Sequence, residues 1–268
     1  MTALAHFVAV SCYLGATAAA ATPFARPVPP PVRIVVLALG AGVFAHLVAL
    51  AGVSRSLGLI PLTGLGPALS FAGLMLGIVL LAAELLAREV TLTLVAAPLA
   101  ALVTSAAVII GLTPALDPVG ARGVWLVSHI LMSFVGIAAH ATAAAAGAMY
   151  LVEHRQLKAR QFGAVFRFFP PLETLDRVNH IAAIAGWMVL TLGIVLAISY
   201  SVTYQAVDLA QSVWGVGAWA CLTAIALGRV IGGMQAKRAA MVSVGTFALV
   251  LVAYLAFRLT LPSAGRFL

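Results

Sequence analysis

The sequence predicts an all-α fold: a polytopic integral membrane protein with eight transmembrane helices and both termini outside. Three observations predict it. Of the 268 residues, 63% are hydrophobic and 8% are charged, and the mean hydropathy is +1.14, which is far from the composition of a soluble domain. Apolar stretches of about 18 residues or more recur along the chain, each long enough to cross a hydrocarbon core. Charged, proline and glycine residues gather between these stretches, where connections are expected.

A single transmembrane domain is expected to cover residues 1–268. Its expected spans are 3–21, 34–53, 68–87, 90–112, 124–152, 177–203, 212–232 and 240–261. The amino terminus lacks the basic residues of a signal peptide, so we expect the first span to be retained. Cys12 and Cys221 fall inside spans and form no motif, which indicates free thiols among the helices rather than a disulfide framework.

Turn-forming residues separate the spans in order. The first span ends at the proline-rich PFARPVPPPVR, the second at SRSLGLIPLTGLGP and the fourth at TPALDPVGARG. Only Arg88 and Glu89 separate the third and fourth spans, which predicts a tight turn. Glu84 precedes Arg88 by one helical turn, an order that favours an ion pair within the helix. The longest connection is 153–176, between spans five and six.

The positions of the basic residues predict the orientation. Most of the 15 lysines and arginines lie after spans one, three, five and seven, and the positive-inside rule places those connections in the cytoplasm. The net charge of +8 therefore indicates membrane orientation and not a nucleic-acid partner. Segment 153–176 mixes basic residues with four phenylalanines, which predicts an interfacial amphipathic segment or, alternatively, a docking surface for a cytoplasmic protein. These phenylalanines are Phe162, Phe166, Phe168 and Phe169.

Histidines inside the spans are the candidate functional residues, because an imidazole within a membrane is costly and marks a functional site by default. His129 and His140 are eleven residues apart in an uncharged span, so they share a helix face and differ by about 16 Å in depth. With the predicted orientation, His46 lies at the outer depth of His129, and His180 at the inner depth of His140. Two imidazoles on facing helices can both ligate a haem iron. The depths therefore predict two bis-histidine haem sites.

Other readings of these residues stay open. Each histidine could instead form a hydrogen bond across helices, and zinc is less suited because no cysteine or carboxylate lies nearby to complete its ligand set. His6, near the outer start of the first span, needs no functional explanation, and His154 is expected to be solvated. Arg55 and Arg122 fall on the outer side, where they could meet haem propionates or act as plain interface charges. No nucleophile with a neighbouring base, phosphate loop or carboxylate pair indicates an enzyme.

Four stretches resemble, in the same order, segments of the CcsA/CcmC-type cytochrome c assembly family, and are most similar to its HemX and YpjD-like branch of short proteins with eight spans. The resemblance implies a bacterial inner (plasma) membrane location, haem as cofactor and other cytochrome c assembly components as partners. It implies that His129 is an outer-face haem ligand, that His46 matches an early-span histidine and that His180 matches a histidine of YpjD-like members. The stretches are FAHLVALAGVSRSLG, WLVSHILMSFVGIAAHATAAAAGAMYLVEHRQLK, LETLDRVNHIAAIAGWMVLTLGIVLA and GRVIGGMQAKRAAMVSVGTFALVLVAYL.

One family feature is absent. Haem-delivering members carry a tryptophan-rich motif, WGxxWxWDxxE, where this chain reads SYSVTYQAVDLAQSVWGVGAW with Asp208 as the only acid. Direct transfer of haem onto an apocytochrome is therefore not expected. The main hypothesis is a haem-binding or haem-handling membrane protein. The alternative, implied by the HemX branch, is a non-catalytic regulator of tetrapyrrole (haem) synthesis that acts on glutamyl-tRNA reductase through 153–180 and 233–239. A transporter or a quinone-linked function is the third class.

Overall fold

The structure is a computed structural model that describes residues 2–26, 28–57, 62, 64–87, 90–113, 123–160, 163, 168–204 and 209–260. Within these residues every regular element is an α-helix, and eight helices are long and apolar enough to cross a membrane. This confirms the predicted all-α fold with eight spans. The helices are α1 (Thr2–Ala20), α2 (Thr22–Ala25), α3 (Val32–Leu57), α4 (Leu65–Ala87), α5 (Thr93–Ile110), α6 (Gly123–Lys158), α8 (Leu172–Tyr204), α9 (Leu209–Val230) and α10 (Ala236–Thr260).

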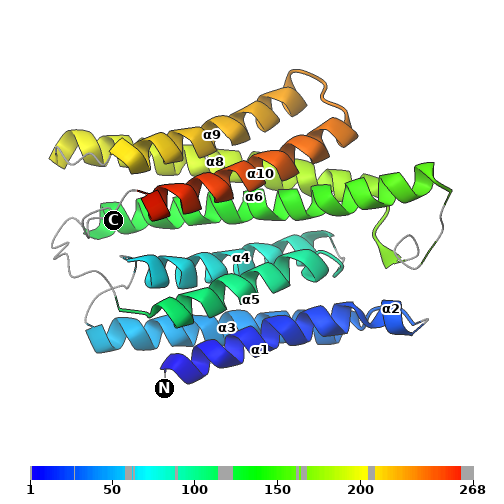
Figure 1. The fold of residues 1–268 in the computed structure, drawn as a ribbon, viewed down its shortest axis with the longest axis horizontal. Helices are drawn as coiled ribbons and strands as arrows, with labels where there is room; N and C mark the ends of the chain where they lie inside the picture. The colour runs from blue at the N-terminus through cyan, green and yellow to red at the C-terminus, as the bar shows by residue number, and fades with distance from the viewer. Residues whose placement is uncertain are drawn as a thin grey trace.

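The long helices run side by side and form two groups (Figure 1). In the first group α1 packs on α3 and α5, and α4 packs on α5; in the second, α6 packs on α8 and α10, and α9 packs on both α8 and α10. The main contact between the groups is that of α4 with α6. Helix α1 begins and α10 ends at the same end of the bundle (Figure 1), as an even number of spans requires. The positive-inside rule predicts that this end is outside.

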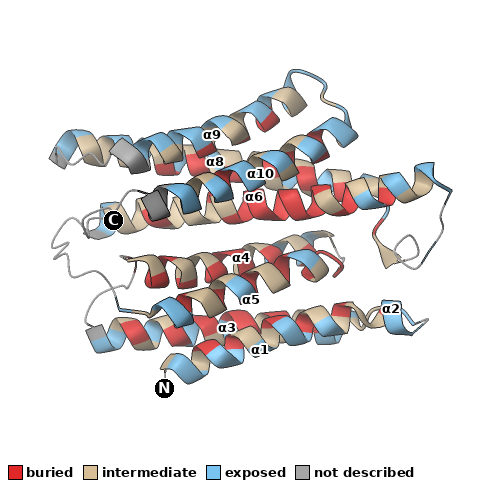
Figure 2. Ribbon diagram, viewed as in Figure 1, coloured by how far each residue is buried: buried red, intermediate tan, exposed pale blue. Residues whose placement is uncertain are grey.

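Small residues bring α6 and α8 close together. Helices in lipid gain no hydrophobic energy from associating, so close backbone packing between small residues supplies much of the attraction. A Cβ added at Gly136 would lie 2.8 Å from the Leu190 Cβ and 3.1 Å from the Gly186 carbonyl oxygen. Residues 141–147 of α6 are all buried, and they form the red run along α6 in Figure 2. Helix α6 is therefore the central helix of the second group.

The connection expected at 153–176 is shorter than predicted. Helix α6 continues to Lys158 and α8 begins at Leu172, because Glu, Gln, Leu, Lys and Arg continue a helix as well as the apolar residues before them. With 36 residues, α6 is about 54 Å long, well beyond a hydrocarbon core of about 30 Å. Its carboxyl end extends past the other helices at the right of Figure 1. Hydropathy located the membrane span correctly, but not the end of the helix.

Two contacts between aromatic rings lie at the end of the bundle where α6 ends. The imidazole of His154, which was expected to be solvated, stacks on the Tyr150 ring with centroids 5.9 Å apart and planes at 11°. Phe168 meets Phe24 of α2 edge to face, with centroids 6.0 Å apart. The segment that precedes α8 is thereby joined to the connection between α1 and α3. Phe162 and Phe166 lie outside the described residues.

Candidate functional site: the intramembrane histidines

A hydrogen-bonded cluster joins α1, α3 and α4. The His46 Nδ1 lies 3.3 Å from the Tyr13 hydroxyl oxygen, and its Nε2 lies 3.0 Å from Ser70 Oγ. Ser70 Oγ also lies 2.8 Å from His6 Nε2, and His6 Nδ1 lies 2.9 Å from the Thr2 carbonyl oxygen. His6, Tyr13, His46 and Ser70 are all 0% exposed. Both ring nitrogens of His46 are therefore engaged within the protein.

The structure brings His46 to His6. Their ring centroids are 5.3 Å apart with an interplanar angle of 68°, which is edge-to-face contact and leaves no room for a porphyrin between the rings. No hydrogen bond or ring contact joins His46 to His129 among the described residues. The ring contact between α4 and α6 is made instead by Phe71 and Phe134, with centroids 5.4 Å apart. The expected pairing of His46 with His129 rested on depth, and depth does not decide which helices are neighbours.

Glycines make room for this cluster. A Cβ added at Gly77 would lie 2.6 Å from the Tyr13 hydroxyl oxygen, and one at Gly42 would lie 2.9 Å from the Tyr13 ring. A Cβ at Gly73 would lie 3.4 Å from the His46 ring. Tyr13 thus packs directly on the backbones of α3 and α4. Glycines in two spans, together with a tyrosine, two histidines and a serine within the spans, were the sequence signal that reasoning from histidine depth missed.

His129 has a different environment, on the face of α6 that contacts α8. Its Nδ1 lies 2.8 Å from the Gly193 carbonyl oxygen. A carbonyl oxygen only accepts, so Nδ1 carries the hydrogen and Nε2 of the neutral ring presents a lone pair, with no hydrogen-bond partner. The next polar atom, Ser133 Oγ, is 3.5 Å from Nδ1, and a Cβ at Gly193 would lie 3.0 Å from it. Metal-binding histidines characteristically have one ring N–H fixed on a carbonyl and the other nitrogen free.

No hydrogen bond or ring contact joins His140 to His180 among the described residues. His140 Nε2 lies 3.0 Å from Thr246 Oγ1 of α10. Because that hydroxyl donates to the Val242 carbonyl at 2.7 Å, the ring Nε2–H is the donor in the contact. The His140 Nδ1 is then a buried acceptor with no hydrogen-bond partner, and the ring edge packs on Phe247. His180, on α8, is half-buried and forms no hydrogen bond. The expected inner pair remains a prediction.

The charged candidates divide between the described residues and the rest of the chain. Arg55 is exposed at the end of α3 and forms no ion pair. Arg122, like Arg88, lies outside the described residues. Glu84 is buried, and its Oε1 accepts hydrogen bonds from the Thr93 backbone N–H at 2.6 Å and hydroxyl at 2.7 Å. Glu84 therefore binds the start of α5, which is a structural role; the ion pair expected with Arg88 involves a residue outside the described ones and stays a prediction.

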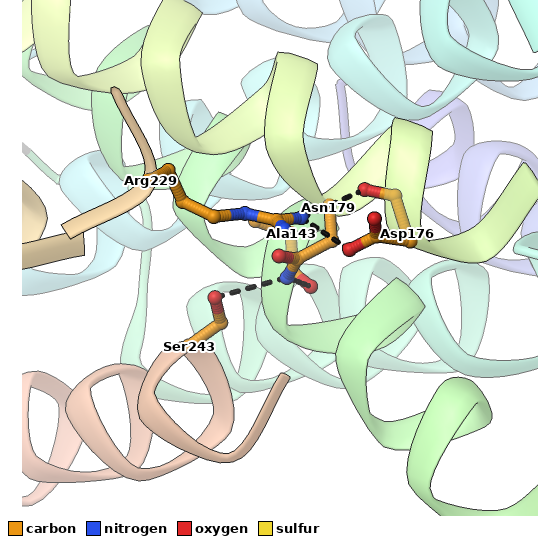
Figure 3. A network of polar contacts seen from close by, with 5 residues as sticks. All are labelled: Ala143, Asp176, Asn179, Arg229 and Ser243. Carbon is orange, nitrogen blue, oxygen red and sulfur yellow. Dashed lines mark hydrogen bonds and ion pairs between the residues drawn. The ribbon is translucent and has the colours of Figure 1, made fainter. Parts of the chain in front are cut away.

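A second polar network joins α6, α8, α9 and α10, and Figure 3 shows it. The Arg229 guanidinium pairs with the Asp176 carboxylate and donates to the Asp176 carbonyl oxygen at 3.1 Å. The Asn179 side-chain amide donates to the Ala143 carbonyl oxygen at 2.7 Å and to Ser243 Oγ at 2.9 Å. Asp176 and Asn179 are three residues apart, so they share one face of α8. The network ties the four helices of the second group at one depth.

No three histidine, cysteine, aspartate or glutamate side chains come together in the part of the chain that the structure describes. A metal held by these residues would have one or two protein ligands, as a haem iron has. Cys12 and Cys221 are both free and half-buried, which confirms that they form no disulfide.

Comparison with known proteins gives one match. A family model described as "Cytochrome C assembly protein" matches residues 62–263. The match runs from just before α4 to the end of α10, so it includes Ser70, His129 and Asn179, and it leaves out α1 and α3. No curated protein and no solved structure matches the chain.

Proposed function

Because the chain belongs to the cytochrome c assembly protein family, which confirms the resemblance in the sequence, we propose that it handles haem in the membrane through His129. The observation that carries the proposal is the state of this ring: the Gly193 carbonyl fixes its Nδ1–H at 2.8 Å, and Nε2 is left free. Bound haem iron would accept the Nε2 lone pair. The carbonyl would then hold the ring orientation and increase its basicity.

The other expected ligands suit haem less well. Iron could bind His46 Nε2 only if the bond to Ser70 were broken, so we do not assign His46 to haem. His140 offers its Nδ1 in the fully buried core. Along α6, His140 lies about 16 Å from His129, so the two residues do not bind the same iron. His180 has no partner that would fix its ring. His129 alone combines a fixed ring with a free nitrogen.

Haem titration of the purified protein tests this assignment. Added haem is expected to give a sharpened Soret band in the wild type and a weaker, shifted band in His129→Ala, because the variant lacks the axial nitrogen. His180→Ala is the matched control: it removes an imidazole from the facing helix α8 and is expected to leave the band unchanged. A wild-type protein that binds no haem, or a His129→Ala band equal to that of the wild type, would overturn the proposal.

A non-catalytic regulator is the second candidate. It is favoured by the end of α6 that extends past the other helices (Figure 1), where Val152, Arg155, Gln156 and Ala159 line a hollow in the surface. Under this alternative the hollow contacts glutamyl-tRNA reductase. Arg155→Ala combined with Gln156→Ala is expected to abolish co-purification of the reductase, and retention at the wild-type level would remove the alternative. The same variant is expected to bind haem normally, so the two candidates are distinguished.

A further inference from the structure

The last turns of α6 form a hollow that can hold a small molecule. Val152, Arg155, Gln156 and Ala159 line it, and its volume is about 380 Å³, within the range of about 300–1,000 Å³ that is usual for ligand sites. Their spacing places all four residues on one face of the helix. The hollow therefore offers an occupant a cation and an amide between two apolar side chains.

The hollow lies at the depth of the phospholipid headgroups. The uncharged part of α6 ends at Val152, which is 45% exposed, so the hydrocarbon core ends near this residue. Arg155 is about 5 Å further along the helix axis and Ala159 about 10 Å, whereas the headgroup layer is about 5–8 Å thick. A lipid beside α6 would therefore place its acyl chains along the span and its phosphate next to Arg155.

The charges at this end of α6 favour an anionic headgroup. Arg155 is exposed, and it forms no ion pair with any residue that the structure describes. Lys158 and Arg160 follow it and are exposed as well. Basic residues directly beyond a transmembrane helix attract anionic lipids. Each acidic residue that the structure describes is already buried or ion-paired: Glu84 and Glu153 are buried, Glu173 pairs with Arg177, and Asp176 pairs with Arg229.

The amide oxygen of Gln156 narrows the choice of headgroup. Gln156 Oε1 is buried and accepts no hydrogen bond from the described part of the chain, and a buried acceptor without a donor is costly. The occupant should therefore donate a hydrogen bond as well as carry a negative charge. A glycerol headgroup meets both needs, because its phosphate is anionic and its hydroxyl groups donate. Lipids with choline or ethanolamine headgroups carry no net charge, and choline has no hydrogen to donate.

We propose that the hollow binds a phosphatidylglycerol molecule from the membrane leaflet at this end of the bundle. The Arg155 guanidinium donates to the phosphate, a headgroup hydroxyl donates to Gln156 Oε1, and an acyl chain packs on Val152. The inference goes beyond haem handling and does not depend on His129. A lipid in the hollow would exclude a protein partner from it, so the inference competes with the second candidate function.

Native mass spectrometry of the purified protein in detergent tests the inference without any variant. Phosphatidylglycerol, phosphatidylmethanol and phosphatidylcholine with identical acyl chains are added in equal amounts. Phosphatidylmethanol has the same charge as phosphatidylglycerol but no headgroup hydroxyl. Phosphatidylglycerol is expected to be bound about 2–10-fold more than phosphatidylmethanol, as one net hydrogen bond gives, and phosphatidylcholine is expected to be bound least. Phosphatidylglycerol bound no better than phosphatidylmethanol would overturn the proposal. Glycerol 3-phosphate, which lacks acyl chains, is expected not to bind, and its binding at the level of the lipid would show a site for a free phosphate instead.

Two variants assign the contacts within the hollow. Arg155→Ala is expected to weaken binding of phosphatidylglycerol and phosphatidylmethanol alike, about tenfold, since a charged hydrogen bond is lost. Gln156→Leu is expected to lower phosphatidylglycerol binding to the level of phosphatidylmethanol and to leave phosphatidylmethanol binding unchanged. Lys237→Ala is the matched control, because this exposed lysine lies in the first turn of α10, at the same end of the bundle (Figure 1) but outside the hollow. Equal weakening in Lys237→Ala and Arg155→Ala would show a general attraction to the basic surface and would overturn the site.

Discussion

Replacing Gly136 by alanine tests whether the close approach of α6 and α8 holds the second group of helices together. The added Cβ would lie 2.8 Å from the Leu190 Cβ and 3.1 Å from the Gly186 carbonyl oxygen. Neither of these is the flexible end of a side chain, so relief requires that the two helix backbones move apart. His129 lies two turns from Gly136 on the same helix and contacts α8 through the Gly193 carbonyl. The same movement is therefore expected to loosen that contact.

The expected cost follows from the geometry. Forcing one extra carbon into a tightly packed contact destabilises a protein by about 1–3 kcal/mol. Gly217→Ala in α9 is the matched control, since its Cβ would have no heavy atom within 4 Å. Replacing a glycine whose backbone suits alanine stabilises by about 0.4–1 kcal/mol. The two variants are thus expected to change the free energy of unfolding in opposite directions.

Reversible unfolding in mixed detergent micelles, followed by circular dichroism, measures both variants. Gly136→Ala is expected to unfold at lower denaturant fraction than the wild type, and Gly217→Ala at an equal or higher one. In a haem titration, Gly136→Ala is also expected to show a weaker Soret band, while Gly217→Ala behaves as the wild type. Equal stability of the two variants would refute the reasoning that backbone contact sets the distance between α6 and α8.

Two further predictions concern the network of Figure 3. A double-mutant cycle of Asn179→Ala and Ser243→Ala, measured by the same unfolding assay, tests the hydrogen bond between these side chains. We expect a coupling energy of about 0.6–1.7 kcal/mol, as for other hydrogen bonds between membrane helices. Single-variant effects that simply add would contradict this prediction. Asp176→Asn is expected to destabilise the protein more than Arg229→Gln does. Asp176→Asn leaves an unpaired guanidinium that is only 7% exposed, whereas Arg229→Gln leaves an unpaired carboxylate that is 32% exposed. The reverse order of the unfolding midpoints would contradict this reasoning.

The spans could be predicted because hydropathy and helix length are properties of local sequence. A stretch that can cross the membrane is recognised without knowledge of its neighbours, and all eight were found within a few residues of their helices. The end of α6 was missed because a helix that leaves the membrane has no reason to stop there. The bonds from Glu84 to Thr93 at the start of the next helix were not predicted, because spacing along one helix gives no information about a residue beyond the turn.

The partners of the histidines could not be predicted for a different reason. The sequence and the positive-inside rule give each residue a depth, but the neighbours of a helix depend on its rotation and on which helices pack. His46 meets His6 because glycines let α1, α3 and α4 approach closely around Tyr13. His129 was singled out from its place in an uncharged span, but the contact that fixes its ring is with a backbone carbonyl of α8. No side-chain pattern reveals which carbonyl a ring will meet.

The most direct test of the central claim is chemical rescue at His129. In His129→Gly the ring is removed and the space it occupied is left open, so free imidazole can take its place on the iron. We predict that haem-loaded His129→Gly loses the wild-type Soret position and regains it when imidazole is added. A variant whose spectrum equals that of the wild type before imidazole is added would contradict the account, because another group would then be the ligand.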